Sequence, residues 1–109
     1  KAFLFLTAVR RILLIFQHTK EFPREYKYTL GQDMKRDGLV LVRSIYRANK
    51  SYDKEEHLEQ FLDDFEILKL ETRLCVDLKI LPIKKQAHIS QLMESIGKQI
   101  TGWRNSAGR

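Results

Sequence analysis

The sequence predicts an all-α protein: an antiparallel up-down-up-down four-helix bundle that forms a single domain over residues 1–109. Four long segments carry apolar residues at steps of three and four, which is the spacing of one helix face. The breaks between these segments are short, which favours antiparallel neighbours. With 5 Gly and 2 Pro, the chain also lacks the turn residues that an all-β fold requires.

The first predicted helix covers residues 2–18. Its start resembles the apolar core of a signal sequence, but Arg10 and Arg11 interrupt the run. The segment is too short and too charged to span a bilayer. We therefore interpret it as a buried helix and expect no membrane association. Its predicted apolar face consists of Phe5, Val9, Ile12, Leu13 and Phe16.

The second predicted helix covers residues 29–49. The preceding stretch TKEFPREY breaks the first helix, because a helix interior does not tolerate Pro23. Thr29 is a candidate N-cap. Gly38 costs about 1 kcal/mol relative to Ala in a helix interior, so its position predicts a close helix crossing. The apolar stripe consists of Leu30, Met34, Leu41, Ile45 and Ala48.

The third predicted helix begins after the turn ANKSYD, with Ser51 or Asp53 as its cap, and runs to about Ile80. Pro82 either ends this helix or begins the fourth, which covers residues 83–104. The apolar band of the third helix is wide and predicts contact with more than one neighbour; it consists of Leu58, Phe61, Leu62, Phe65, Leu68, Leu70, Leu74, Cys75 and Leu78. The stripe of the fourth helix consists of Ile89, Leu92, Met93, Ile96, Ile100 and Trp103.

Residue patterns in the chain predict no catalytic site and no metal site. His18, His57 and His88 lie on three different segments, without partners at metal-ligand spacing. Cys75 has no neighbouring base, and as the single cysteine it cannot form an internal disulfide, which favours a reducing, cytoplasmic compartment. The chain has no glycine-rich phosphate loop. We therefore expect a protein that is not an enzyme and has no cofactor and no small-molecule substrate.

Charge is unevenly distributed along the chain. Residues 53–71 hold eight acidic and two basic side chains, whereas the remaining ninety residues hold eighteen basic and six acidic ones, for a net charge of +6. The third helix therefore has an acidic start in a basic protein. Acidic residues in a first helical turn also stabilise the positive end of the helix dipole, which is a purely structural reason for their position.

Four cations of the second helix form a row that we call the basic strip: Arg36, Arg43, Arg47 and Lys50. At about 100° per residue, the four lie within roughly 60° of one another. No Asp or Glu lies four residues from any of them. Arginine binds phosphate through a planar fork, so an unneutralised strip beside Tyr46 suits a nucleic-acid backbone. The alternative is that the strip forms salt bridges with the acidic helix start of a neighbouring subunit.

Excess apolar surface favours self-association. The first and third helices are apolar over more of their circumference than one bundle seam requires. Large exposed apolar surfaces are typical of subunit contacts. We therefore expect a homo-oligomer.

Three stretches of the chain resemble one protein family: FPREYKYTLGQ (22–32), RLCVDLKIL (73–81) and KKQAHISQLMESIGKQITGW (84–103). They are similar to the small bacterial four-helix-bundle proteins that include the 23S rRNA-intervening-sequence proteins and the accessory variability determinant (Avd) of diversity-generating retroelements. The resemblance implies a cyclic homopentamer with a basic surface. In the retroelement branch it implies binding to a reverse transcriptase and its template nucleic acid. In the ribosomal branch it implies a reading frame inside an insertion of a 23S rRNA gene.

The sequence leaves two functions open. The first is a non-enzymatic accessory protein that binds the backbone of RNA or DNA through Arg36, Arg43, Arg47 and Lys50. The second is a structural or protein-interaction oligomer that binds no nucleic acid and uses the basic strip in subunit contacts.

Overall fold

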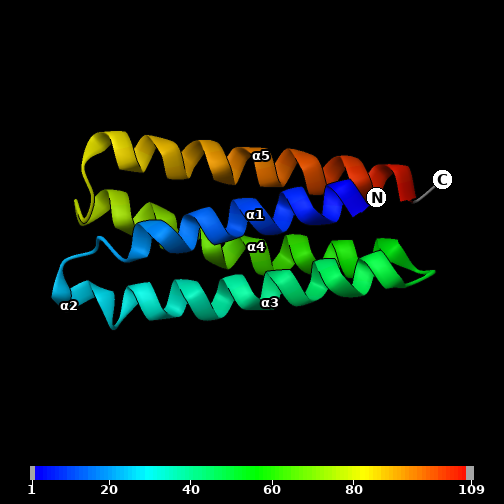
Figure 1. Cartoon of the computed structure of the whole chain (residues 1–109), viewed down its shortest axis with the longest axis horizontal. Coiled ribbons are helices and arrows are strands. Elements are labelled where there is room, and N and C mark those ends of the chain that lie inside the picture. Colours follow the sequence, from blue (N-terminus) through cyan, green and yellow to red (C-terminus); the bar gives the residue numbers. More distant parts are fainter. Residues whose placement is uncertain (1, 108–109) are drawn as a thin grey trace.

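The computed structural model describes the backbone of residues 2–107 and the side chains of residues 5–107. In chain order, its elements are α1 (Ala2–Thr19), α2 (Arg24–Lys27), α3 (Leu30–Lys50), α4 (Lys54–Asp77) and α5 (Ile83–Ala107). Successive long helices run in opposite directions along a bundle of 44 × 22 × 20 Å (Figure 1). Residues 2–107 contain no strand. The predicted all-α, up-down-up-down four-helix bundle is confirmed.

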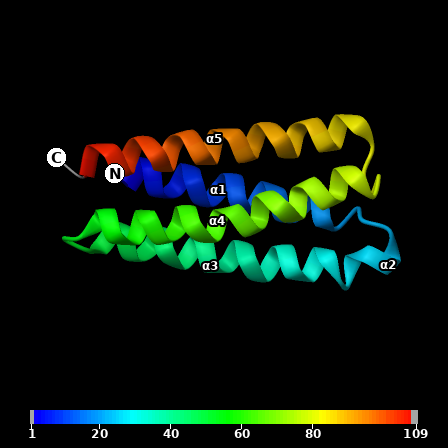
Figure 2. The ribbon, with the colours of Figure 1, turned by 180° about the vertical axis from the view of Figure 1, so that it is seen from behind.

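Each long helix packs against two others. α1 and α4 lie diagonally opposite one another, and each contacts both α3 and α5. Seen from behind, α4 runs between α3 and α5 (Figure 2). The fully buried side chains recur at the predicted steps of three and four; they include Ile12, Met34, Leu41, Ile45, Phe61, Leu68, Ile96 and Ile100. Burial of these side chains at about 25 cal/mol per Å² of apolar surface holds the four helices together.

The predicted close crossing at Gly38 lies between α3 and α1. A Cβ atom on Gly38 would overlap Cε1 of Phe16 and lie 2.7 Å from Cζ of the same ring. It would also lie 3.4 Å from Cγ2 of Ile12. Only glycine therefore allows α1 to approach α3 this closely, and packing compensates for its low helix propensity.

The break between α1 and α3 differs from the prediction. Part of it forms the single-turn helix α2, which begins after Pro23, a residue suited to a helix start. Thr29 precedes α3 as expected, but its side chain does not cap that helix. The Thr29 hydroxyl instead donates a hydrogen bond to the Glu25 carbonyl oxygen at 3.0 Å. Thr29 is therefore the N-cap residue of α3, as predicted, but only its backbone carbonyl takes part, accepting from the Asp33 N–H at 3.0 Å.

The start of α4 matches the prediction, but its end does not. The Asp53 carboxylate accepts a hydrogen bond from the Glu56 backbone N–H at 3.3 Å, which confirms the cap. The helix ends at Asp77 instead of Ile80, because Lys79 adopts a left-handed φ of 54°. The Ile80 N–H then donates to the Cys75 carbonyl at 3.1 Å, which is the closing bond of a Schellman motif.

Several predicted core residues are exposed. Leu13 of α1 faces solvent, while Ala8 and Ile15, which we had not assigned to that face, are buried. On α4, three leucines of the predicted apolar band are exposed and continue a row that we call the α4 stripe: Ile67, Leu70, Leu74 and Leu78. The band is therefore wide because it has a second apolar face, which points away from the bundle core.

Among residues 2–107, no helix is both long enough and apolar enough to cross a membrane.

Candidate nucleic-acid interface

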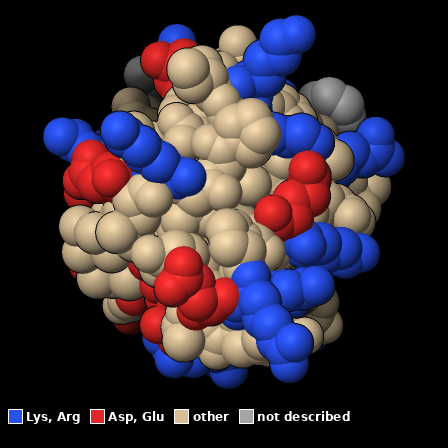
Figure 3. Space-filling model, turned by 90° about the vertical axis from the view of Figure 1, so that its left-hand side faces the viewer, with Lys and Arg blue, Asp and Glu red and all other residues tan. Residues whose placement is uncertain are grey.

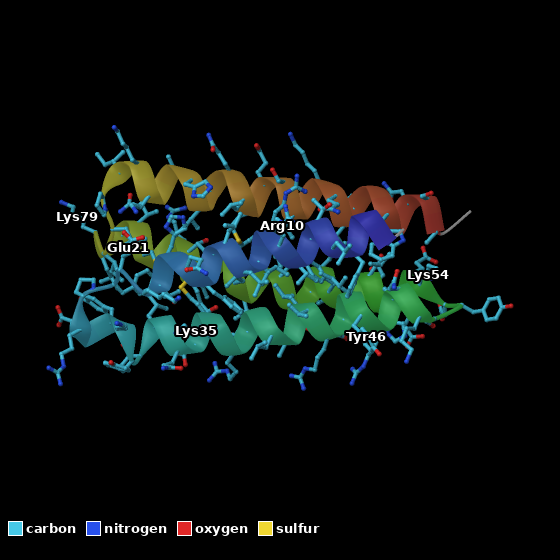
Figure 4. All side chains as sticks on the ribbon, viewed as in Figure 1. Arg10, Glu21, Lys35, Tyr46, Lys54 and Lys79 are labelled. Carbon is cyan, nitrogen blue, oxygen red and sulfur yellow. The ribbon has the colours of Figure 1, made fainter. Side chains whose placement is uncertain are left out.

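The basic strip lies on the outer face of α3. Its core stripe, from Met34 to Ala48, faces α1 and α4, and all four strip residues are exposed. In Figure 4 the side chains of α3 project outward along this edge of the bundle, with Tyr46 among them. The predicted alignment of Arg36, Arg43, Arg47 and Lys50 on one face therefore agrees with the structure.

Arg36 is not an unneutralised cation, contrary to the prediction. Its Nη1 lies 3.2 Å from Oδ1 of Asp33, and its Nε lies 3.4 Å from Oδ1 of Asp37. The hydrogen bond and the charge of Asp37, with the charge of Asp33, raise the pKa of the Arg36 guanidinium. These two acids lie three residues before and one residue after Arg36, so the spacing of four residues does not detect them.

Arg43 and Arg47 are the free cations of the strip. Among the described residues, neither has a carboxylate within ion-pair distance. Lys50 contacts Tyr46: its Nζ lies 3.5 Å from the phenol oxygen and 5.0 Å from the ring centroid. These three side chains are thus available to an anion from outside, and binding it would break no intramolecular salt bridge of theirs.

The two flanks of α3 differ in charge. Asp33 and Asp37 lie on the flank toward α4, where Asp37 meets Glu71. Tyr46 lies about 180° around the helix from Asp37 and contacts Phe5 of α1, with ring centroids 6.4 Å apart. The sequence of α1 contains no Asp or Glu, and Arg10 is exposed on it. The flank of α3 toward α1 is therefore basic and free of acids from either helix.

A buried carboxyl pair between α3 and α4 was missed by the sequence analysis. Glu71 is 7% exposed, and neither its Oε1 nor Oδ2 of Asp37 has a hydrogen-bond partner in the described chain. Burial, followed by the hydrogen bond and charge of Asp37, raises the pKa of Glu71 to about 8. Glu71 therefore keeps its proton at neutral pH. Its spacing from Leu68 and Cys75, three and four residues, could have placed it in the core.

A second missed cluster joins α1 to α5. His18 Nε2 lies 2.7 Å from His88 Nδ1, so one imidazole donates a hydrogen bond to the other. Burial and the neighbouring His88 lower the pKa of His18. Beside them, Lys85 Nζ pairs with Glu21 at 2.8 Å and lowers the pKa of that carboxyl. We had noted only that the histidines lie on different segments; the end of α1 and the start of α5 bring two of them together.

The described residues were predicted to hold no metal site, and their His, Cys, Asp and Glu side chains are scattered. The described residues contain no cluster of three or more His, Cys, Asp and Glu side chains that could hold a metal ion. Burial raises the pKa of the Cys75 thiol to about 11, and its Sγ lies 3.7 Å from Sδ of Met34, which is a packing contact. A hollow beside Trp103 is lined by Tyr52, Lys54 and Lys98, but by no acid or histidine of the described chain.

The end of the bundle that carries α2 provides a contrast. Figure 3 shows this end, where blue and red side chains are interspersed around the rim. The Glu21–Lys85 pair belongs to the connections at this end. Positive charge there is partly neutralised within the molecule, unlike the acid-free flank of α3.

Comparison with known proteins places the chain in one family. A family model described as bAvd-like matches residues 8–107. This chain belongs to the bAvd-like family. The match confirms the Avd-like resemblance found in the sequence, and it covers α3, α4, α5 and most of α1. Neither the curated proteins nor the solved structures gave a match.

Proposed function

We propose that this bAvd-like protein is a non-enzymatic accessory protein that binds the phosphate backbone of nucleic acid through the outer face of α3. The observation that carries the proposal is the pair Arg43 and Arg47, exposed side by side without a carboxylate partner in the described chain. Lys50 extends the site, whereas Arg36 contributes less because it already pairs with two acids. A backbone site of this kind reads charge and not sequence.

Self-association is the second part of the proposal. The exposed α4 stripe is an apolar surface of the kind that subunits bury. We propose a cyclic homo-oligomer, a pentamer as the family resemblance implies, acting in the cytoplasm. A ring would present several copies of the basic strip to one nucleic acid and would strengthen weak contacts by avidity. In a retroelement, a reverse transcriptase would be the protein partner.

The alternative function is a structural or protein-interaction oligomer without nucleic-acid binding. It is favoured by the acidic start of α4, where Glu55 and Glu56 are exposed. In a ring, Arg43 and Arg47 of one subunit could pair with these acids of the next. Salt would then weaken subunit association, whereas in the first proposal salt would weaken nucleic-acid binding.

The test is a titration of the protein with a structured RNA and with a duplex DNA over a series of salt concentrations. We expect micromolar or tighter binding at low salt, and a double-logarithmic salt slope of several units. The double variant Arg43→Glu, Arg47→Glu should weaken binding by at least about tenfold. Light scattering should show an unchanged oligomer for the variant.

A matched control changes the net charge equally at the α2 end. Arg24 begins α2 and Lys84 lies in the first turn of α5, and both are exposed. The double variant Arg24→Glu, Lys84→Glu should bind nearly as the wild type does. An equal loss of nucleic-acid affinity in both double variants would mean that only net charge matters, which would contradict a binding site on α3. A changed oligomer in the α3 variant alone would favour the interaction-oligomer alternative.

A further inference from the structure

Tyr46 is an exposed aromatic ring inside the proposed phosphate site. It is 52% exposed on the acid-free flank of α3. It lies three residues after Arg43 and four before Lys50, so all three side chains share one side of the helix. Phosphate binding by arginine and lysine does not require an aromatic ring at this position. The exposure of Tyr46 is therefore not explained by a backbone-only site.

The contacts of the ring show how it is held. Phe5 of α1 packs beside it at a centroid distance of 6.4 Å and an interplanar angle of 54°. On the open side, the Lys50 ammonium lies 5.0 Å from the ring centroid, in a cation–π contact. The hydrocarbon of α1 thus supports the ring, and the position over its face is occupied by one flexible side chain.

The surroundings of the ring match the chemistry of a nucleic-acid base next to its phosphates. Leu39 of α3 and Leu6 and Leu13 of α1 are exposed. At about 100° per residue, Leu39 shares the helix side of Tyr46, seven residues later, and Leu6 and Leu13 share one side of α1. Arg10 of α1 and Arg43 of α3 are exposed cations, and α1 holds no acid. Apolar and aromatic surface beside cations, without carboxylates, is the arrangement that single-stranded nucleic acids bind, because their bases are free to stack.

We propose that the flank of α3 toward α1 binds single-stranded nucleic acid, with a base stacked on Tyr46 and the adjoining phosphates on Arg43 and Lys50. The base takes the position over the ring that Lys50 occupies in the free protein, and Lys50 turns to a phosphate. The inference rests on the proposed function, since it needs nucleic acid at the basic strip. The stacking site adds a preference in binding affinity for single-stranded over duplex nucleic acid, which a site of positive charge alone would not give.

The experiment compares three probes: single-stranded oligo(dT), single-stranded oligo(U) and a DNA duplex. Each is about 20 nucleotides or base pairs long, which exceeds the site of about 4–16 nucleotides that a single OB fold covers. Each is titrated with the wild type, Tyr46→Leu and Tyr46→Phe. We expect Tyr46→Leu to weaken single-strand binding about five- to 150-fold, the range for loss of one stacked base. Its duplex affinity should change less than about twofold, because its phosphate contacts remain.

Two variants separate stacking from other roles of Tyr46. Tyr46→Phe keeps the ring and should bind like the wild type; a loss equal to that of Tyr46→Leu would mean that only the hydroxyl matters and would overturn stacking. Tyr28→Leu is the matched control, because Tyr28 is 63% exposed and follows α2 at the other end of the bundle. It should not alter binding. A probe carrying 5-iodouracil should crosslink under light to the peptide that contains Tyr46.

The outcomes distinguish the stacking site at Tyr46 from the proposed function, nucleic-acid binding, on which it rests. If the wild type binds no probe at low salt, the proposed function fails and the stacking site fails with it. If the wild type binds all probes and Tyr46→Leu weakens none, or weakens single strand and duplex equally, only the stacking site is overturned. A changed oligomer mass in Tyr46→Leu would assign this flank to subunit contact and would also overturn it.

Discussion

The two flanks of α3 show how one helix carries charge for two purposes. On the flank toward α4, Asp33 and Asp37 hold Arg36, and Asp37 meets the protonated Glu71. On the outer face and the flank toward α1, Arg43 is exposed without an acid partner in the described chain, and Tyr46 covers the seam to Phe5. Charges of the first flank are neutralised inside the molecule and act on stability. Those of the second are left for a partner, so their removal should affect binding and not folding.

The largest effect on stability is expected beneath the second flank, at Gly38. In Gly38→Ala the new methyl group would collide with the Phe16 ring. We expect a loss of about 2 kcal/mol in the free energy of unfolding, from overpacking of about 3 kcal/mol less a gain of about 1 kcal/mol in helix propensity. Urea unfolding measures it. In Gly102→Ala of α5, the added Cβ would meet no side chain and no backbone beyond the adjoining turns of its own helix within 4 Å. We expect no loss there and a gain of up to about 1 kcal/mol. Equal behaviour of the two variants would contradict the close crossing of α1 and α3.

Glu71→Gln tests the first flank and should stabilise the protein. In the folded protein the pKa of Glu71 is raised to about 8, from 4.5. Between these values the unfolded chain releases the proton and the folded protein keeps it, so stability falls as pH rises from 4.5 toward 8. Above about pH 8 the loss of stability caused by burying Glu71 no longer changes with pH. The amide removes the cost, and we expect a gain of about 1–3 kcal/mol at pH 8 with little change below pH 4.5.

The control for that variant is Glu66→Gln, which removes an exposed carboxylate paired with Lys69 at 2.8 Å. It should change stability by less than about 0.5 kcal/mol. Nucleic-acid affinity should be the same in both variants. If Glu71→Gln weakened nucleic-acid binding and Glu66→Gln did not, a change on the flank toward α4 would affect binding on the flank toward α1. The two flanks would then not act independently.

A smaller effect is expected at the histidine pair, and it has the opposite pH direction. Burial and His88 lower the pKa of His18 below its usual 6.5. Below pH 6.5 the unfolded chain takes up a proton that the folded protein binds only at lower pH, so stability is lost on acidification through that window. In His18→Gln this loss should shrink, because the amide takes up no proton in either state. Thermal unfolding from pH 5 to 7 measures it. If His18→Gln lost as much stability on acidification as the wild type, the burial of a neutral His18 would be contradicted.

The sequence could predict most of the fold, because the spacing of apolar residues defines the core face of each helix. The crossing at Gly38 was also predictable, because glycine lowers helix stability and a close approach of another helix compensates for that cost. The end of α4 was not, because Lys79 takes a left-handed conformation without the glycine that normally signals it. The exposed α4 stripe has the same periodicity as a core face, so spacing alone cannot tell a bundle contact from a surface.

The candidate site was predictable in position but not in pairing. Helical spacing placed Arg36, Arg43, Arg47 and Lys50 on one face. Their partners depend on which way each side chain turns, and Arg36 turns toward acids at positions that we did not consider. Tyr46 could be placed beside the strip, but its support by Phe5 depends on the register of α1 against α3. That register is a property of the packed core and is not contained in the pattern of any single helix.

The salt dependence of nucleic-acid binding by Arg36→Gln and Arg43→Gln tests the difference between the two flanks most directly. Each variant removes one positive charge from the same helix. If Arg43 contacts a phosphate and Arg36 remains with Asp33 and Asp37, Arg43→Gln should reduce the double-logarithmic salt slope on duplex DNA by about 0.9, and Arg36→Gln should leave it unchanged. An equal reduction in both variants, or in neither, would contradict the assignment of the outer face of α3 to nucleic acid.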